Sequence, residues 1–192
     1  MNIAGAILAD EGGLPPIQAA GYEYVVAGNG LFIRAEDSRM EAMVPIASAR
    51  MRLGLANVEP YARLKVDRIS SWALWMIGQD AWKEVPKETI YQFTWNGEWK
   101  VVMPNQHGWQ AGVRFEDDGQ SVVDLHSHAN LEAFFSNVDD EDELGLRFYA
   151  VIGRLDTEWP EIAVRVGVYG HHLRVPAKTV FDGLGPFLER VT

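Results

Sequence analysis

The sequence predicts an α/β (α+β) fold in which a mixed β-sheet is flanked by helices. Runs of β-rich residues alternate with two helical patterns along much of the chain, and this alternation is typical of layered α/β and α+β domains. With 192 residues, 47% of them hydrophobic, the chain can bury a sizeable core in one compact domain. We expect a small β-rich N-terminal appendage over residues 1–60 and the main domain over residues 61–192.

The N-terminal region predicts a β-hairpin followed by a third strand. Tyr22–Ala27 and Leu31–Ala35 are rich in strand-forming residues. The glycines and asparagine at 28–30 tolerate the backbone of a tight turn between them. Met43–Ile46 can add a third strand, and Gly12–Pro16 is typical of a loop. No residue pattern in this region points to chemistry.

A helix is expected next, from Asp67 to Trp82. Apolar residues recur there at helical spacing, Asp67 can cap the first turn, and Pro86 ends the pattern. Tryptophan is frequent in this stretch (Trp72, Trp75 and Trp82). Because aromatic side chains are mostly buried, we expect these tryptophans to pack against the sheet rather than to line a ligand site.

The rest of the chain predicts a succession of strands and one further helix. The helix starts in Asp139–Leu146, and Asn96-Gly97 makes a turn between the first two strands. The expected strands are Glu88–Trp95, Trp99–Met103, Gly112–Phe115, Ser121–Leu125, Phe148–Ile152 and Ile162–Tyr169.

Composition excludes several classes of protein. The net charge of -10 repels phosphate backbones, so we expect no nucleic-acid partner. No apolar run approaches the ~20 residues of a membrane span, and the first residues lack the basic region of a secretory signal. We therefore expect a cytoplasmic protein. The absence of cysteine excludes disulfides, a thiolate nucleophile and cysteine-ligated metal sites.

One stretch, from Asp124 to Glu143, carries residues that point to a metal. His126 and His128 stand two apart at the end of a β-rich run, so both imidazoles project from the same face of a strand. Asp139 follows beyond a loop and can supply a third ligand. Two histidines and one carboxylate, with a fourth position left for water, are typical of a catalytic zinc site.

Ser136 and Asp139 also form the pattern of a capping box, in which both side chains satisfy free amides at a helix start. Capping alone does not explain the whole spacing, His-x-His-x7-Ser-x2-Asp. This pattern should arise by chance in roughly 3 of 10,000 chains of this composition. Six acidic residues and no basic residue lie between Glu132 and Glu143, and together they can attract a cation or a basic substrate tail.

At His126, His128, Ser136 and Asp139 the sequence resembles the JAB/MPN metalloproteases. The JAMM motif of that family is an upstream glutamate followed by H-x-H-x7-S-x2-D. Within the family, AFFSNVDDEDE, YAVIG and RVGVYG are most similar to the bacterial PRTRC system protein A group. The resemblance implies a cytidine-deaminase-like core over about residues 61–175. It also implies that the two histidines and Asp139 bind one zinc ion and that Ser136 helps to stabilise an oxyanion.

The resemblance also requires an upstream glutamate near the start of a strand that follows the first long helix. Glu88, in Pro86-Lys87-Glu88, fits that place, and a carboxylate beside zinc-bound water can act as a general base. Glu84 remains the rival, while Glu98 and Glu116 stand beside expected turns. A structural alternative also stays open, in which Glu88 is an exposed acid at a strand edge.

Two departures from the family pattern concern the substrate groove. Many members have proline after the second histidine and glycines after the glutamate, where this chain has Ala129-Asn130 and Thr89-Ile90-Tyr91. The remaining histidines are expected outside the site. His171-His172 follows a strand that ends in glycine and predicts a surface turn, and His107 predicts a loop.

These residues lead us to expect zinc-dependent hydrolysis of a peptide or isopeptide bond, with Glu88 as general base. The resemblance implies a ubiquitin-like protein as substrate. Two other functions have to be compared with this one. A PHP-type phosphoesterase needs histidines and acids spread across a barrel, and only two histidines remain in the 64 residues after His128. An inactive MPN-like scaffold for protein–protein interaction remains an alternative, although the chain keeps all four residues of the H-x-H-x7-S-x2-D motif.

Overall fold

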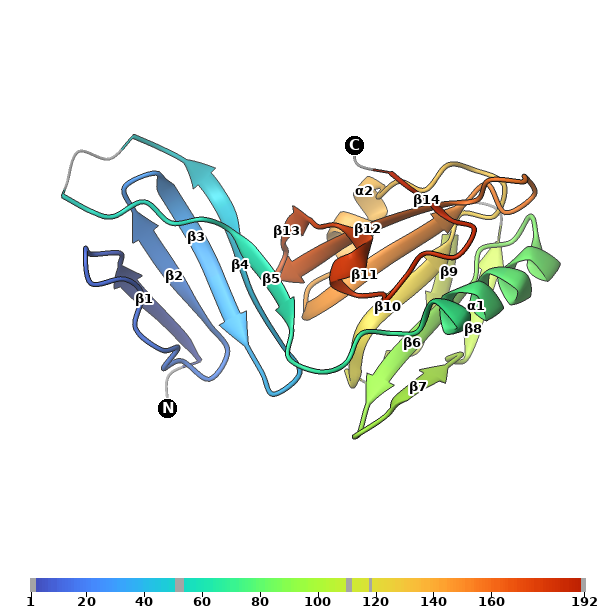
Figure 1. The fold of residues 1–192 in the computed structure, drawn as a ribbon, viewed down its shortest axis with the longest axis horizontal. Coiled ribbons are helices and arrows are strands. Elements are labelled where there is room, and N and C mark those ends of the chain that lie inside the picture. Colours follow the sequence, from blue (N-terminus) through green and yellow to red (C-terminus); the bar gives the residue numbers. More distant parts are fainter. Residues whose placement is uncertain (1–2, 51–53, 110–111, 118, 191–192) are drawn as a thin grey trace.

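The computed structural model describes residues 3–50, 54–109, 112–117 and 119–190 (Figure 1). Its architecture is mixed α/β and mostly sheet. Two large sheets lie side by side, a two-stranded hairpin projects from the larger one, and helices are few. The mixed α/β class expected from the sequence is therefore confirmed.

The first sheet is five-stranded, with the order β1-β2-β3-β4-β5. Strand β1 runs parallel to β2, and the other neighbours are antiparallel. The expected hairpin and third strand are confirmed as β2, β3 and β4, whereas β1 and β5 were not expected. The expected boundary at residue 60 falls between β4 and β5, inside this sheet. The strands are β1 (Ala4–Leu8), β2 (Tyr22–Ala27), β3 (Gly30–Glu36), β4 (Met40–Ser48) and β5 (Tyr61–Leu64).

The two large sheets share one hydrophobic core. Ile33 and Ala35 of β3 and Val44 of β4 belong to the same buried cluster as Val164 and Val166 of the second sheet. In Figure 1 the first sheet stands against the edge of the second that carries β13. The N-terminal region is thus packed against the rest of the chain through fully buried side chains.

The second sheet has seven strands, and its strand β10 carries His126. Its order is β13-β12-β11-β10-β6-β7, with β14 paired to β12. Strands β10 and β11 are parallel, as are β12 and β14, and the remaining pairs are antiparallel. The strands are β6 (Ile90–Trp95), β7 (Trp99–Val102), β10 (Ser121–Ser127), β11 (Leu146–Gly153), β12 (Glu161–Val168), β13 (His171–Arg174) and β14 (Leu188–Glu189), and a 3-10 turn, η1 (Ala177–Thr179), precedes β14.

The long helix α1 (Ser71–Glu84) covers one face of the second sheet. Its N-cap is Ser70, whose hydroxyl accepts a hydrogen bond from the Trp72 amide at 3.2 Å, so the expected cap at Asp67 is wrong. The helix is confirmed, but the expected burial of its tryptophans is also wrong. The buried face consists of Leu74, Ile77, Gly78 and Ala81, whereas Trp72, Trp75 and Trp82 are exposed.

A separate hairpin, β8 (Gln106–Trp109) and β9 (Gly112–Phe115), lies beside the start of β6. The Glu88 amide donates to the carbonyl of Trp109 at 3.0 Å, and the Ile90 amide donates to the side chain of Gln106 at 2.8 Å. Strand β8 was not expected, and the loop expected at His107 is wrong because that residue lies within it.

Candidate metal centre

The two histidines lie at the end of the central strand β10. His126 is in the strand and His128 follows its last residue. Strand β10 is flanked by β6 and β11, so its backbone is held on both sides. Because residues two apart share a face of a strand, both rings point to the same side of the sheet. Asp139 lies in the short helix α2 (Asn137–Asp142) above them.

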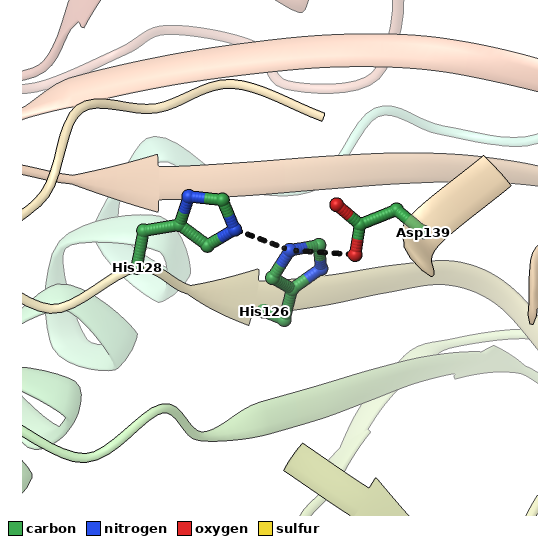
Figure 2. A group of neighbouring side chains, drawn as sticks. All are labelled: His126, His128 and Asp139. Atoms are coloured by element: carbon green, nitrogen blue, oxygen red, sulfur yellow. Dashed lines mark hydrogen bonds and ion pairs between the residues drawn. The ribbon is translucent and has the colours of Figure 1, made fainter. Parts of the chain in front are cut away.

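Figure 2 shows the three side chains facing one another. The Nε2 atoms of His126 and His128 are 3.2 Å apart, and Oδ1 of Asp139 lies 3.3 Å from the His126 Nε2. One ligand atom from each residue lies within 4.8 Å of the other two. Tetrahedral zinc with bonds near 2.0–2.1 Å separates its ligand atoms by about 3.4 Å. The donor set and the two short spacings are those of a group that could hold a metal ion.

The orientation of His128 is set by the backbone. Its Nδ1 lies 3.2 Å from the carbonyl oxygen of Glu132. Since a carbonyl only accepts, Nδ1 must donate, and the lone pair of the neutral ring is then on Nε2, the atom that faces His126. A hydrogen bond of this kind from the second ring nitrogen is usual for metal-binding histidines.

The capping box holds Asp139. The Ser136 amide donates to Oδ2 of Asp139 at 2.6 Å, and the Asp139 amide donates to the Ser136 hydroxyl at 3.3 Å. This confirms the capping box expected from the sequence. It occupies one carboxylate oxygen and leaves Oδ1 toward the histidines. The Ser136 hydroxyl accepts in this pair, so its own proton is free to point elsewhere.

Burial puts the site in the protonation state that binds metals. It lowers the pKa of His126 to about 4 and also lowers the pKa of His128. For Asp139, burial alone would raise the pKa, but His126 and the hydrogen bonds from Ser136 outweigh it and lower the pKa. At neutral pH the site therefore presents two neutral imidazoles and one carboxylate, the forms that coordinate a cation.

Glu88 lies beside this group. Continuing the antiparallel pairing of β6 with β10 beyond the Ile90–His126 pair sets Glu88 opposite His128, on the same face of the sheet. It is 7% exposed, so it is not the exposed strand-edge acid of the structural alternative. Burial, followed by the nearby charge of Asp139, raises the pKa of Glu88 to about 7. Among the described residues, none donates a hydrogen bond to its carboxylate.

A cavity of about 390 Å³ opens over these residues. Glu88, His126, His128, Ser136 and Asp139 all line it. One wall comes from the β9 strand of the hairpin, and the opposite wall comes from α2 and the segments on either side of it. Most of the wall is apolar: Ile90, Val113, Phe115, Leu131, Phe134, Val138 and Leu144.

Arg165 of β12 anchors α2, which has no buried residue of its own. Its Nε donates to Glu143 at 2.6 Å, and its Nη1 donates to Asp140 at 2.5 Å. The guanidinium also lies 4.0 Å from the ring centroid of Phe135. Arg165 is 5% exposed and Glu143 is 7% exposed. Helix α2, which carries Asp139, is therefore attached to the sheet by this buried pair rather than by apolar packing.

A second buried ion pair lies at the far side of the cavity. Arg147 donates to Asp124 at 2.7 Å and contacts Asp117 at 2.7 Å. All three residues line the cavity. Sequence reasoning missed Asp124, Arg147 and Arg165. The rule that residues two apart share a strand face could have found Asp124, which precedes His126 by two positions, but no local signal marks the two arginines.

Ala129, directly after His128, has a left-handed backbone with φ of 49° and is fully buried. Few non-glycine residues adopt this conformation. Proline, with φ fixed near −65°, cannot adopt it. The backbone conformation at position 129 is therefore incompatible with the proline that many JAB/MPN proteins have after the second histidine.

The remaining histidines and glutamates lie outside the metal group. The surface turn expected at His171-His172 is wrong, since both residues are in β13, where His172 Nε2 contacts the carbonyl of Glu143 at 3.2 Å. His107 is exposed on β8. The other glutamates considered, Glu84, Glu98 and Glu116, are exposed and line no part of the cavity, and Asp118 of the expected turn lies outside the described residues.

Comparison with known proteins adds no relative to this picture. No protein-family model matches the chain, and no curated protein matches it. Within the part of the chain that the structure describes, no helix is both long enough and apolar enough to cross a membrane.

Proposed function

We propose that this chain is a zinc-dependent hydrolase of the JAMM type that cleaves a peptide or isopeptide bond. One observation carries the proposal: Glu88, a buried carboxylate to which no described residue donates a hydrogen bond, lines the same cavity as a histidine–histidine–aspartate group that could hold a metal ion. Resemblance to the JAB/MPN motif points to the same chemistry. We also propose that the chain has a JAB/MPN core and that, within that family, it is most similar to the PRTRC system protein A group.

His126, His128 and Asp139 would hold the ion. When bound there, zinc would supply Lewis-acid chemistry, lowering the pKa of water and polarising the scissile carbonyl. The Glu132 carbonyl accepts a hydrogen bond from His128, and the Ser136 amide donates one to Asp139. These two bonds hold the side chains in the orientations that a ligand role needs.

Glu88 acts as the general base and then as the general acid. A carboxylate with a pKa near 7 can take a proton from a water at neutral pH and return it to the leaving amine. The buried position opposite His128 keeps this carboxylate out of bulk solvent. No ion pair with a described residue competes for it.

Ser136 donates a hydrogen bond to the tetrahedral oxyanion. Its hydroxyl accepts from the Asp139 amide, which orients the oxygen and leaves the proton free for substrate. Donors of this kind contribute about 3 kcal/mol to transition-state stabilisation.

The substrate we propose is an extended chain end, such as the tail of a ubiquitin-like protein. A cavity bounded by a hairpin on one side and by apolar side chains on the other suits an extended peptide better than a compact small molecule. Asp142, an exposed acidic residue of α2 that lines the cavity, favours a tail with basic residues.

The test combines metal analysis with two kinds of substitution. Purified protein should contain one zinc per chain, and the double substitution His126→Ala plus His128→Ala should remove it. Glu88→Gln should keep the zinc but reduce cleavage of a ubiquitin-like protein carrying a C-terminal fluorogenic extension by more than a hundredfold. Glu84→Gln, on the exposed helix end, is the matched control and should leave the rate unchanged.

Zinc retained after both histidines are replaced would refute the metal assignment. Zinc binding without hydrolysis of any ubiquitin-like extension, and with no effect of Glu88→Gln on partner binding, would support the inactive scaffold instead.

A further inference from the structure

Helix α1 exposes a row of large apolar side chains that nothing in the described fold covers. Trp72, Trp75, Met76 and Trp82 are 67%, 41%, 43% and 54% exposed. We call these four residues the aromatic face of α1. They lie three, four or seven positions apart along one side of the helix, opposite the side that packs on the sheet. Solvent-exposed helix faces are normally polar, so this face departs from the usual pattern.

The exposed surface continues beyond the helix into a hollow of mixed polarity. This hollow of about 190 Å³ lies beside Trp75 and Trp82, and its lining also includes Glu158, Pro160 and Phe187. Trp159, which stands within the loop that borders this hollow, is 57% exposed, and Leu188 is 51% exposed.

The exposed apolar area is enough for the centre of a protein interface. Trp72, Trp75, Trp82 and Trp159, of about 250 Å² each and roughly half exposed, together present about 500 Å². This lies in the upper part of the range for the largest apolar patch of a monomer, about 300–600 Å², and patches of that size are often functional. The residues around the tryptophans would supply the rest of the roughly 800 Å² that a stable interface buries on each partner.

We propose that two copies of this chain associate through their aromatic faces, with the two α1 helices antiparallel. The two ends of the face are equidistant from Ile77, since Trp72 and Trp82 lie five residues to either side of it. An antiparallel pair centred there sets Trp72 of one copy against Trp82 of the other, twice, by symmetry. It also lays Trp75 of each copy over Gln79 of the other, at the edge of the hollow. This self-complementarity is what a two-fold interface requires.

The net charge of the chain determines how dimerisation should depend on salt. Each copy carries a net charge of -10, so two copies repel each other at long range, while the surface that joins them is apolar. Salt screens the repulsion without weakening apolar burial. Dimerisation should therefore strengthen as salt increases, contrary to an interface held by ion pairs.

The surface is separate from the candidate metal centre. No residue of α1 lines the cavity that holds Glu88 and His126. Dimerisation and hydrolysis can therefore fail independently, and the inference does not rest on the proposed function.

Sedimentation velocity on the full chain over a range of micromolar concentrations tests the proposal. The wild type should be a dimer, more so at high salt. Trp72→Glu or Trp82→Glu should raise the dimer dissociation constant at least thirtyfold, as expected for an interface tryptophan that contributes about 2 kcal/mol or more. Both positions are exposed, so circular dichroism should show an unchanged fold. Val101→Glu, at an exposed apolar residue of β7, is the matched control and should leave the dimer intact.

The antiparallel register has its own test. Trp72→Lys and Trp82→Glu should each be monomeric alone but should associate when mixed, because residue 72 of one then faces residue 82 of the other. The chain has no cysteine, so Met76→Cys near the two-fold axis should cross-link between copies with a short bismaleimide, and Val101→Cys should not. A wild-type monomer at every concentration, or a dimer that survives both tryptophan substitutions, would overturn the proposal.

Discussion

A substitution of Arg165 tests whether this residue holds the candidate metal centre together. Replacing it with methionine keeps much of the apolar stem but removes the guanidinium that holds Glu143 and Asp140. Because no residue of α2 is buried, the helix should lose its main attachment to the sheet. Asp139 would then no longer be held beside His126, although β10 and both histidines stay in place.

The magnitude follows from the two hydrogen bonds. A bond to a charged partner contributes about 1.5–3 kcal/mol. The bond to Glu143 joins two buried groups and should count fully, whereas Asp140 is 52% exposed on its side chain and its bond is largely screened. We therefore expect a loss of about 3 kcal/mol in the attachment of α2. If all of it is transmitted to the site, zinc affinity falls about a hundredfold.

Competition with a chromogenic zinc chelator measures this affinity. Arg165→Lys, which keeps the charge but not the forked geometry, should recover part of it. Arg63→Met is the matched control, because Arg63 pairs with Glu41 at the surface with a side chain 70% exposed, and it should change nothing. A folded Arg165→Met protein whose zinc affinity stays within twofold of the wild type would refute the reasoning.

Three further predictions concern the same site. Because burial lowers the pKa of His126 from 6.5 to about 4, this residue takes up a proton in the unfolded chain before it does in the folded one. In the metal-free protein His126 should therefore contribute about 3 kcal/mol of unfolding free energy that is lost as the pH falls from 6.5 to 4, whereas Glu88, whose pKa is raised to about 7, contributes in the opposite direction. Urea titrations across that range should show the His126 contribution as the difference between the wild type and His126→Gln, and exposed His107→Gln should leave the pH dependence unchanged. Gly108→Ala would put a Cβ 2.0 Å from the Glu88 carbonyl oxygen, so the backbone that positions Glu88 would have to move. The rate of hydrolysis should fall while the zinc content stays unchanged, and full activity would contradict the placement of the hairpin beside Glu88. Ala129→Pro cannot adopt the φ of 49° and should lower the thermal midpoint strongly, whereas Ala129→Gly should be neutral or stabilising.

The sequence by itself determined the parts of the site that depend on local geometry. The spacing of His126 and His128 sets both rings on one strand face, and the capping box joins Ser136 to Asp139 within a single helical turn. Both are consequences of backbone periodicity over a few residues. The same periodicity predicted β2, β3, most strands of the second sheet and the existence of α1.

Only the tertiary structure determined which segments far apart in the sequence contact one another. Periodicity shows that α1 has apolar residues, but which side faces the sheet depends on packing against distant groups such as Phe187, and the result leaves the tryptophans outside. Burial of Glu88 depends on a hairpin that pairs with its backbone, and the position of α2 depends on Arg165, 26 residues after Asp139 in the sequence. Contacts between residues far apart in the chain leave no local pattern. For this reason the candidate ligands could be predicted from the sequence, whereas the residues that hold and bury them could not.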